Sequence, residues 1–345
     1  MGDATRSWVQ RSAALIGAAL VVMLSAGCRV PFDFDGDGAS DQAWIDRVSG
    51  AWSRNTPDGV EQFAALPSFV TQGNGVHERA YAVPGNYDGD LAWEPAMVDS
   101  GTGDWATAGA AGTFNFPSPG FVGNDYDPAS SIVPVPGVWA GGTATVPAWY
   151  RDTDATWWIR GYFPIQFGRG PSDIDILSPS ADQDIPVPAD YDGDGTTDLA
   201  VFRPWSTEWT IRHSATGVVH TTVFGSQWGV PVPADYDGDG TTDLATYDVG
   251  GHEGTWAIEG YWPIHFGPRA TPMPADYDGD GRTDLAVRTG AETQVHNLPS
   301  FTVPGLGDVS ASVMPFVAEN VLRMKVLWLC AHNEYVVPCY GGIPA

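Results

Sequence analysis

The sequence predicts an all-β protein, a β-propeller with about four strands per blade, and three observations carry this prediction. An acidic, glycine-containing loop recurs along the chain, and the segment PADYDGDGTTDLA stands unchanged at 188–200 and 233–245. The segments between loops are related as well, since TWWIRGYFPIQFG at 156–168 matches TWAIEGYWPIHFG at 255–267. No stretch beyond the N-terminal segment has a helical period, and 28 prolines and 42 glycines supply turns throughout.

The recurring loops set the expected number of blades. They begin near residues 33, 86, 138, 190, 235, 276 and 306, at intervals of about 30 to 53 residues. Repeats of this length are typical of propellers, in which each sheet packs against its two neighbours. We therefore expect a single propeller over 28–345 with seven blades, six or eight being the alternatives.

Alternating side chains predict strands between the loops. Trp157, Trp209 and Trp256 each stand two residues before an isoleucine. This alternation is typical of a strand with one buried face.

The first residues resemble an export signal. Arg6 and Arg11 precede an apolar segment at 13–27, which is too short for a comfortable membrane span. The segment leads into LSAGC, which resembles the lipobox of bacterial lipoproteins and implies lipidation of Cys28. We expect a signal peptide at 1–27 and a lipoprotein held at the bacterial cell surface by its N-terminal lipid. The alternative is an ordinary secretory signal, with Cys28 unmodified and the protein secreted.

Two further cysteines, Cys330 and Cys339, lie near the end of the chain. Because exported chains meet oxidising conditions, we expect these two to form a disulfide. Two buried thiols are the alternative.

The charge of the chain excludes some partners. The sequence has 16 Lys and Arg against 42 Asp and Glu, a formal net charge of −26, which repels nucleic acid and anionic lipid. Its 43% hydrophobic and 12% aromatic content is too high for a disordered acidic chain. We therefore expect the acids to have a local role in a folded protein.

The acidic loop has the spacing of a cation-binding loop. Carboxylates at its first, third, fifth and ninth positions can point inward together, glycine at the sixth allows a sharp turn, and the seventh offers its carbonyl. Oxygen ligands in this number suit calcium, whereas zinc and copper prefer nitrogen and sulfur. The predicted calcium ligands of the four complete loops are Asp33, Asp35, Asp37, Ala39, Asp41, Asp190, Asp192, Asp194, Thr196, Asp198, Asp235, Asp237, Asp239, Thr241, Asp243, Asp276, Asp278, Asp280, Arg282 and Asp284.

Other interpretations of the loop are weaker. An EF-hand would need a bidentate glutamate at position 12, where Val201, Thr246 and Val287 stand. Plain surface turns would explain one or two Asp and Gly residues, but four crowded carboxylates repel one another unless a cation lies among them.

Three copies of the loop are incomplete. The copy at Asn86 reaches its Leu-Ala early, so we expect Asp88 and Asp90 to lack two of the usual partners. The copies at Val138 and Leu306 have no acid set, so metal-free turns are expected there.

Loops of the form D-x-D-x-D-G-x-x-D-L-A, separated by Phe-Gly strand ends at 167–168, 224–225 and 266–267, resemble FG-GAP or VCBS-type repeats. Such repeats occur in integrin α-subunit propellers and in many bacterial surface proteins. The resemblance covers about residues 29 to 345 and is strongest at 185–290. It implies a calcium-binding propeller used for adhesion or ligand recognition.

An aromatic residue follows the start of six loops. These residues are Phe34, Tyr87, Trp139, Tyr191, Tyr236 and Tyr277. They could form a ring that binds sugars, but a fixed position in every repeat favours a shared packing site between blades.

The sequence has no recognisable catalytic constellation. It has no nucleophile elbow or zinc-protease motif, and its seven histidines share no spacing that would make a metal cluster or triad. Acids expected to lie outside the loops, such as Glu94, Glu208 and Glu259, could meet in space as a glycosidase-like pair.

We therefore expect a non-enzymatic surface module that binds an unknown protein or glycan. A polysaccharide-active hydrolase or lyase on the same scaffold is the alternative. Ligand contacts are expected in the insertions at about 46–80, 99–131 and 169–184, because the longest units carry them.

Overall fold

The computed structural model describes residues 30–302, apart from 47–48, 68–79, 91, 120–131, 171–183, 228, 249–252, 269, 290–291 and 298–300. The predicted signal peptide, the lipidated Cys28, the loop at Leu306 and the Cys330–Cys339 disulfide lie outside the described residues. So does much of the three insertions. The regular elements in the described part are strands, and no helix there could cross a membrane.

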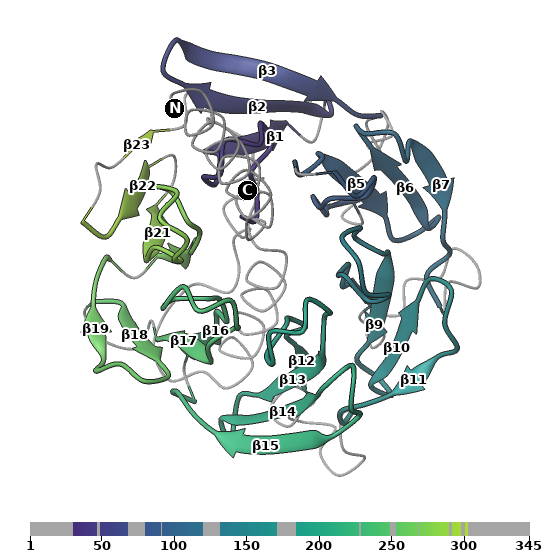
Figure 1. Ribbon diagram of the computed structural model, residues 1–345, viewed down its shortest axis with the longest axis vertical. Coiled ribbons are helices and arrows are strands. Elements are labelled where there is room, and N and C mark those ends of the chain that lie inside the picture. Colours follow the sequence, from purple (N-terminus) through teal and green to yellow (C-terminus); the bar gives the residue numbers. More distant parts are fainter. Residues whose placement is uncertain are drawn as a thin grey trace, which may run out of the picture.

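Six antiparallel sheets are arranged as blades around a central axis (Figure 1). Blade 1 contains β1 (Ala43–Asp46), β2 (Ala51–Thr56) and β3 (Gly59–Ala65). Blade 2 contains β4 (Ala80–Ala82), β5 (Ala96–Asp99), β6 (Asp104–Thr107) and β7 (Thr113–Asn115). Blade 3 contains β8 (Ile132–Pro134), β9 (Ala148–Arg151), β10 (Thr156–Ile159) and β11 (Ile165–Gln166).

The second half of the ring repeats the pattern. Blade 4 contains β12 (Ile185–Pro186), β13 (Leu199–Arg203), β14 (Glu208–Arg212) and β15 (Val219–Val223). Blade 5 contains β16 (Gly229–Pro231), β17 (Ala245–Asp248), β18 (Thr255–Ile258) and β19 (Ile264–His265). Blade 6 contains β20 (Thr271–Pro272), β21 (Ala286–Thr289), β22 (Glu292–Val295) and β23 (Phe301–Thr302).

Each blade is a meander whose strands pair in chain order. Figure 1 shows the first strands, such as β12 and β16, toward the axis and the last strands, such as β15 and β19, at the rim. A loop of nine residues precedes the second strand of blades 2 to 6 and the first strand, β1, of the three-stranded blade 1. We number these loops with their blades: loop 1 (33–41), loop 2 (86–94), loop 3 (138–146), loop 4 (190–198), loop 5 (235–243) and loop 6 (276–284).

One hydrogen bond per blade joins the loops into a closed ring. In each case the N–H of the eighth loop residue donates to the carbonyl of the first residue of the preceding loop, over 2.5–2.9 Å. The bonds run from Trp93 to Asp33, Thr145 to Asn86, Thr197 to Val138, Thr242 to Asp190, Thr283 to Asp235 and Ser40 to Asp276. Because the last of these joins loop 1 to loop 6, the ring closes with six blades.

The expected count of seven blades is therefore not confirmed. The sequence predicts a seventh loop at Leu306, which would make the segment from Phe301 the strand that precedes it. In the structure Phe301–Thr302 is β23, which pairs with β22 as the fourth strand of blade 6. Spacing alone cannot distinguish the first strand of a new blade from the fourth strand of the preceding blade, because both are short and apolar.

Aromatic pairs form the core of the blades. The indoles of Trp157, Trp209 and Trp256 are fully buried on the third strands, as the alternation predicts. Each packs against an aromatic ring of the second strand, at centroid distances of 4.9, 4.8 and 4.7 Å. The Phe-Gly strand end takes part, because the carbonyls of Phe167 and Phe224 accept the indole N–H of Trp157 and Trp209 at 2.9 and 3.1 Å.

The glycine of the Phe-Gly pair is required by the neighbouring blade. Gly225 has φ +91°, and a Cβ at that position would come within 2.5 Å of the Thr246 side chain on β17. Gly267 is in the same situation, with φ +81° and Val287 within 2.4 Å. The Phe-Gly motif of one blade thus packs against the twelfth residue, counted from the loop start, of the next.

Candidate metal-binding loops

The acidic loops fold around their first carboxylate. In loop 5 the Asp235 carboxylate accepts the N–H groups of Gly238, Asp239 and Gly240 at 2.6, 3.2 and 2.9 Å. Both glycines have positive φ, +76° and +88°, which lets the chain wrap tightly around this side chain. Loops 1, 4 and 6 make the same three bonds to Asp33, Asp190 and Asp276.

The ninth residue closes each acidic loop. In loop 5 Asp243 accepts the N–H of Tyr236 at 2.8 Å, and Asp41, Asp198 and Asp284 do the same in loops 1, 4 and 6. The seventh residues, Ala39, Thr196, Thr241 and Arg282, donate their N–H to the fifth carboxylate at 2.7–2.9 Å. The four predicted ligand sets therefore share one backbone arrangement.

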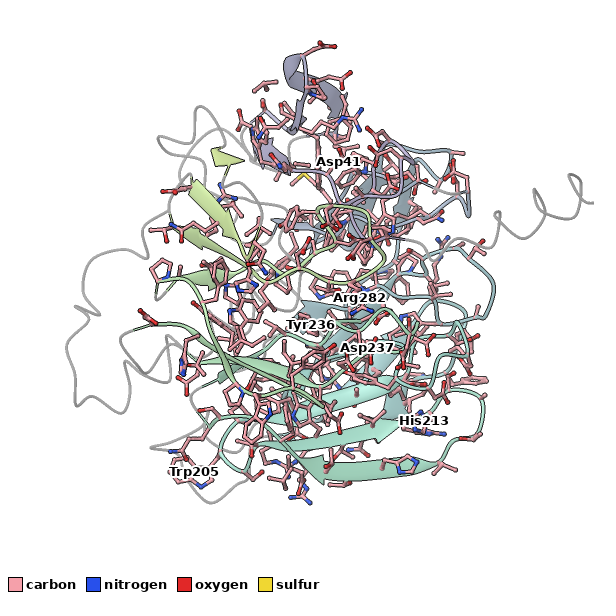
Figure 2. The ribbon with its side chains drawn as sticks, turned by 60° about the vertical axis from the view of Figure 1, so that its left-hand side comes forward. Asp41, Trp205, His213, Tyr236, Asp237 and Arg282 are labelled. Carbon is pink, nitrogen blue, oxygen red and sulfur yellow. The ribbon has the colours of Figure 1, made fainter. Side chains whose placement is uncertain are left out.

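Carboxylate oxygens converge within the loops. In loop 5 oxygens of Asp235, Asp237 and Asp239 all lie within 4.8 Å of one another. The same holds for Asp190, Asp192 and Asp194 in loop 4, and for Asp33, Asp35 and Asp41 in loop 1. Donor sets made of oxygens suit a hard cation such as calcium. Figure 2 shows Asp41, Asp237, Arg282 and His213 on different blades, with Trp205 at the other end of blade 4 from His213.

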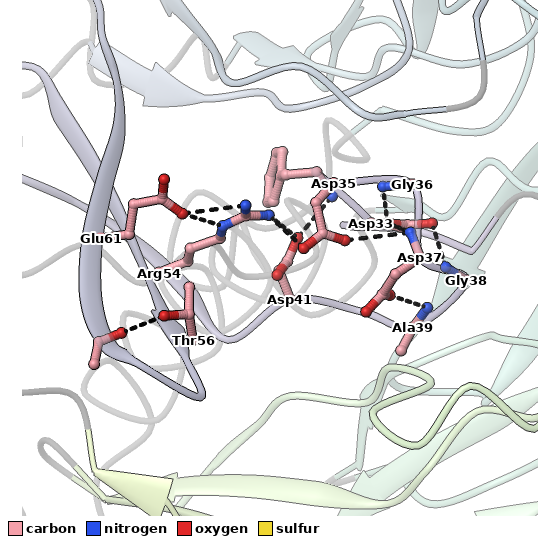
Figure 3. A network of polar contacts seen from close by, with 12 residues as sticks. Asp33, Asp35, Gly36, Asp37, Gly38, Ala39, Asp41, Arg54, Thr56 and Glu61 are labelled. Carbon is pink, nitrogen blue, oxygen red and sulfur yellow. Dashed lines mark hydrogen bonds and ion pairs between the residues drawn. The ribbon is translucent and has the colours of Figure 1, made fainter.

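A cationic side chain from β2 lies against the carboxylates of loop 1. The guanidinium Nη1 of Arg54, on β2, lies 2.9 Å from Asp35 Oδ2 and 3.2 Å from Asp41 Oδ2 (Figure 3). Arg54 also pairs with Glu61 at 3.2 Å. Burial raises the pKa of Asp41 to about 6, while the N–H of Phe34 and the charge of Arg54 oppose that rise.

In loop 4 an imidazole contacts the third and ninth residues, the two positions that Arg54 contacts in loop 1. His213 Nδ1, just after β14, lies 3.2 Å from both Asp192 Oδ2 and Asp198 Oδ2. Burial raises the pKa of Asp198, and hydrogen bonds from the Ser214 and Tyr191 N–H groups and from His213 oppose the rise. Neither Arg54 nor His213 was among the residues predicted from the sequence to lie at these loops. The one available signal was that His213 stands where the related repeats have Gly161 and Gly260.

In loops 5 and 6 the ninth carboxylate is repelled by its neighbours. Burial is the main cause that raises the pKa values of Asp243 and Asp284, and the three other carboxylates of the same loop raise them further. One backbone hydrogen bond opposes each rise. None of the leading causes of either shift is a cationic side chain, whereas the charge of Arg54 lowers the pKa of Asp41 in loop 1. A bound cation would relieve this repulsion.

Loop 2 differs from its expectation. Its ninth residue is Glu94, whose carboxylate is buried and accepts the N–H of Tyr87 at 2.5 Å. Oxygens of Asp88, Asp90 and Glu94 lie within 4.8 Å of one another. The expectation that this loop lacks its partners was therefore wrong. Counting nine positions from Asn86, instead of looking for the Leu-Ala end, would have found Glu94.

Glu94 should make stability depend on pH. Burial raises its pKa to about 7, against an ordinary value of 4.5; the Tyr87 N–H opposes the rise and Asp88 adds to it. A carboxyl with a raised pKa stabilises the fold below its unfolded pKa and loses that contribution as pH rises through the folded value.

In chelator, we therefore expect Glu94→Gln to match the parent near pH 4 and to be about 1–2 kcal/mol more stable above pH 7.5. Denaturant unfolding across that pH range measures the difference. The exposed Glu253→Gln is the matched control and should show no such trend. A difference for Glu94→Gln that does not change with pH would contradict the assignment.

The aromatic residues that follow the loop starts are structural. The hydroxyls of Tyr87, Tyr191, Tyr236 and Tyr277 donate to the carbonyl four residues earlier, at 2.6–3.0 Å. Trp139 does the same through its indole at 3.3 Å. The packing interpretation is confirmed for these five, because their polar atoms are already used inside the blade.

The acids considered for catalysis are not brought together. Glu94 belongs to blade 2, Glu208 lies on β14 of blade 4, and Glu259 follows β18 of blade 5. Glu208 is ion-paired with Arg203 at 2.7 Å, and Arg203 also holds the buried Asp184 at 2.6 Å. The structure thus offers no glycosidase-like pair from these three.

The fold and its loops define a six-bladed β-propeller with acidic loops joined in a ring. No family model and no curated protein matches the chain, so its FG-GAP or VCBS membership stays a prediction. Among solved structures, it is similar to an Agrocybe aegerita lectin described as recognising non-reducing terminal N-acetylglucosamine, with TM-score 0.44, 14% identity and 77% of each chain covered. It is also similar to virginiamycin B lyase from Staphylococcus aureus, with TM-score 0.38, 12% identity and coverage of 76% of this chain and 80% of that one. At these values the similarities do not say what this chain binds.

Proposed function

We propose that this protein is an exported, calcium-stabilised propeller that binds a protein or glycan at the cell surface. The observation that carries the proposal is the close approach of three carboxylates in loop 5, together with the repulsion among carboxylates that raises the pKa values of Asp243 and Asp284 in loops 5 and 6. Such clusters are costly in a folded protein unless a cation joins them. Carboxylate oxygens such as those of these loops are the kind of ligand that calcium prefers.

The loops are expected to differ in affinity. In loops 5 and 6 calcium would enter an acid set in which repulsion among the carboxylates is a leading cause of the raised pKa values of Asp243 and Asp284. In loops 1 and 4 it would have to displace Arg54 and His213 from the same carboxylates. We therefore expect loops 5 and 6 to fill at lower calcium concentrations than loops 1 and 4.

Arg54→Gln tests this competition in loop 1. In chelator, the variant should be destabilised by about 1–3 kcal/mol, because Asp35 and Asp41 lose their cation. With millimolar calcium most of that loss should be recovered, so the calcium-induced rise in melting temperature should exceed that of the parent. Arg151→Gln, which breaks the Arg151–Asp154 ion pair outside the loops, is the control and should respond equally with and without calcium. Equal calcium responses of Arg54→Gln and the parent would argue against a calcium site in loop 1.

Export and anchoring belong to the same proposal. The first loop starts five residues after Cys28, so a lipid on that cysteine would hold the propeller close to the membrane. Labelling with a fatty-acid analogue, with Cys28→Ser as the control, tests the anchor. Label retained by Cys28→Ser would exclude lipidation at this site.

Three assays run side by side distinguish a binding function from a catalytic one. A glycan array and a protein pull-down, each with and without calcium, are run beside a polysaccharide depolymerisation assay. Binding without release of products would support the proposal. Release of oligosaccharide products would overturn it in favour of a hydrolase or lyase.

A further inference from the structure

Two hairpin tips carry aromatic rings into solvent. The turn between β10 and β11 presents Tyr162 and Phe163, which are 50% and 91% exposed. The turn between β18 and β19 presents Tyr261 and Trp262, which are 45% and 89% exposed. Other rings of these blades, such as Trp157 and Trp256, are fully buried. Exposed rings at one position of two repeats indicate a contact surface.

The tips are held in defined turns. The N–H groups of Tyr162 and Tyr261 donate to Ile159 and Ile258 at 2.9 and 3.1 Å, and Gly161 and Gly260 have φ +90° and +80°. The Tyr162 hydroxyl donates to the carbonyl of Trp139 in loop 3 at 3.2 Å. The hydrogen bond from the Tyr162 hydroxyl also shows that the tip of blade 3 lies beside loop 3. Rings fixed in this way lose little entropy when a ligand packs on them.

The neighbouring blades use the same turn differently. In blade 4 it carries His213 and Ser214, and Ser214 folds back to donate its N–H to Asp198 at 2.7 Å. In blade 2 the turn contains Gly109, where a Cβ would lie 2.6 Å from Glu94 Cγ. The exposed rings of blades 3 and 5 are therefore not required by the shared fold of the turn.

Charge indicates the class of ligand. The chain has a formal net charge of −26, and in blade 5 loop 5 is acidic and Glu259 precedes the tip. In blade 3 the loop that the Tyr162 hydroxyl contacts has no acidic residue, and the Arg160 that precedes the tip has its guanidinium 4.4 Å over the Phe114 ring. Rings that insert into membranes usually have basic neighbours that bind lipid phosphates. Acidic surroundings repel such phosphates and nucleic acids. Carboxylates do accept hydrogen bonds from hydroxyl groups, and aromatic faces pack against the C–H faces of a sugar.

We propose that the tips Tyr162-Phe163 and Tyr261-Trp262 are glycan-contacting sites for an uncharged polysaccharide. This inference rests on the proposed binding function and names its ligand class. Each tip provides a stacking surface, and in blade 5 the exposed Glu259 before the tip can accept hydrogen bonds from sugar hydroxyls. Two tips on one face would bind one polymer chain more tightly than either tip alone.

The test uses the full propeller in calcium with insoluble chitin, cellulose and mannan, and with soluble uncharged oligosaccharides by calorimetry. The variants are Phe163→Ala, Trp262→Ala and their double. Trp205→Ala is the matched control, because Trp205 is 57% exposed but lies at the β13–β14 turn on the opposite face. We expect the parent to bind at least one of these glycans, roughly a tenfold loss for each single variant and a larger loss for the double. Trp205→Ala should bind like the parent, and all variants should keep the parent melting temperature.

Several outcomes would overturn the inference. They are glycan binding that the double variant retains, parent binding only to a protein, and parent binding to phosphatidylcholine vesicles that the double variant loses. The first two leave the proposed binding function standing, because the parent still binds. If the parent binds neither glycan nor protein, the proposed function itself fails.

Discussion

Adding millimolar calcium to the chelated protein is expected to raise its melting temperature by several degrees. A site with a dissociation constant about tenfold below the calcium concentration stabilises the fold by about 1.4 kcal/mol. In a chain of this size each kcal/mol raises the melting temperature by roughly 2–4 °C. Chelator should reverse the rise, and scanning calorimetry measures it. A melt that is the same in calcium and in chelator would contradict the proposed sites.

Asp243→Asn should change the sign of its effect with calcium. In chelator, burial and the three other carboxylates of loop 5 raise the pKa of Asp243, so its negative charge is unfavourable in the folded protein. Asparagine removes that charge and can still accept the Tyr236 N–H, so the variant should be as stable as the parent or slightly more. In calcium it lacks one ligand, so its melting temperature should fall below that of the parent.

A matched control separates ligand loss from loss of charge. Asp58→Asn changes the net charge by the same amount in the exposed turn between β2 and β3. It should behave like the parent in both conditions. If Asp243→Asn also behaves like the parent in both conditions, loop 5 is not a calcium site.

Gly225→Ala should be the most damaging small substitution in the Phe-Gly motif. Gly225 has φ +91°, where a side chain costs about 1–2 kcal/mol. The added methyl would also meet Thr246 at 2.5 Å, and overpacking of this kind costs about 1–3 kcal/mol more. We expect a total loss of roughly 3 kcal/mol, measured by denaturant unfolding in saturating calcium.

Gly161→Ala isolates the backbone contribution. Gly161 has φ +90°, nearly the same as Gly225, but a Cβ there would have no atom within 4 Å. It should cost only the backbone part, about 1–2 kcal/mol. If the two variants lose the same stability, contact between blades does not explain the glycine of the motif.

Much of the fold could be predicted because its determinants are local. The four loops with complete acid sets close on hydrogen bonds between residues at most seven positions apart, such as Tyr236 to Asp243. The buried tryptophans follow from alternation along single strands. The ligand sets of four loops and the strand pattern were therefore visible in short stretches of sequence.

Other features depend on residues far apart in the chain. Arg54 and His213 reach their loops from β2 and from the end of β14, and no spacing within the loop indicates them. Glu94 was not predicted for a different reason, because the loop pattern has an Asp followed by Leu-Ala at its ninth position. The exposure of Phe163 and Trp262 was not predictable either, because the same strand pairs carry fully buried rings.

The all-β repeat fold, the positions of the acidic loops and the Phe-Gly strand ends follow from the amino-acid sequence, because they depend on hydrogen bonds and alternation within one repeat. The number of blades follows from the packing of the repeats against one another. The bond from Ser40 to Asp276 joins the two ends of the ring, and its partners belong to the first and last described blades. Ring closure is a property of all six interfaces together, so no single repeat encodes it.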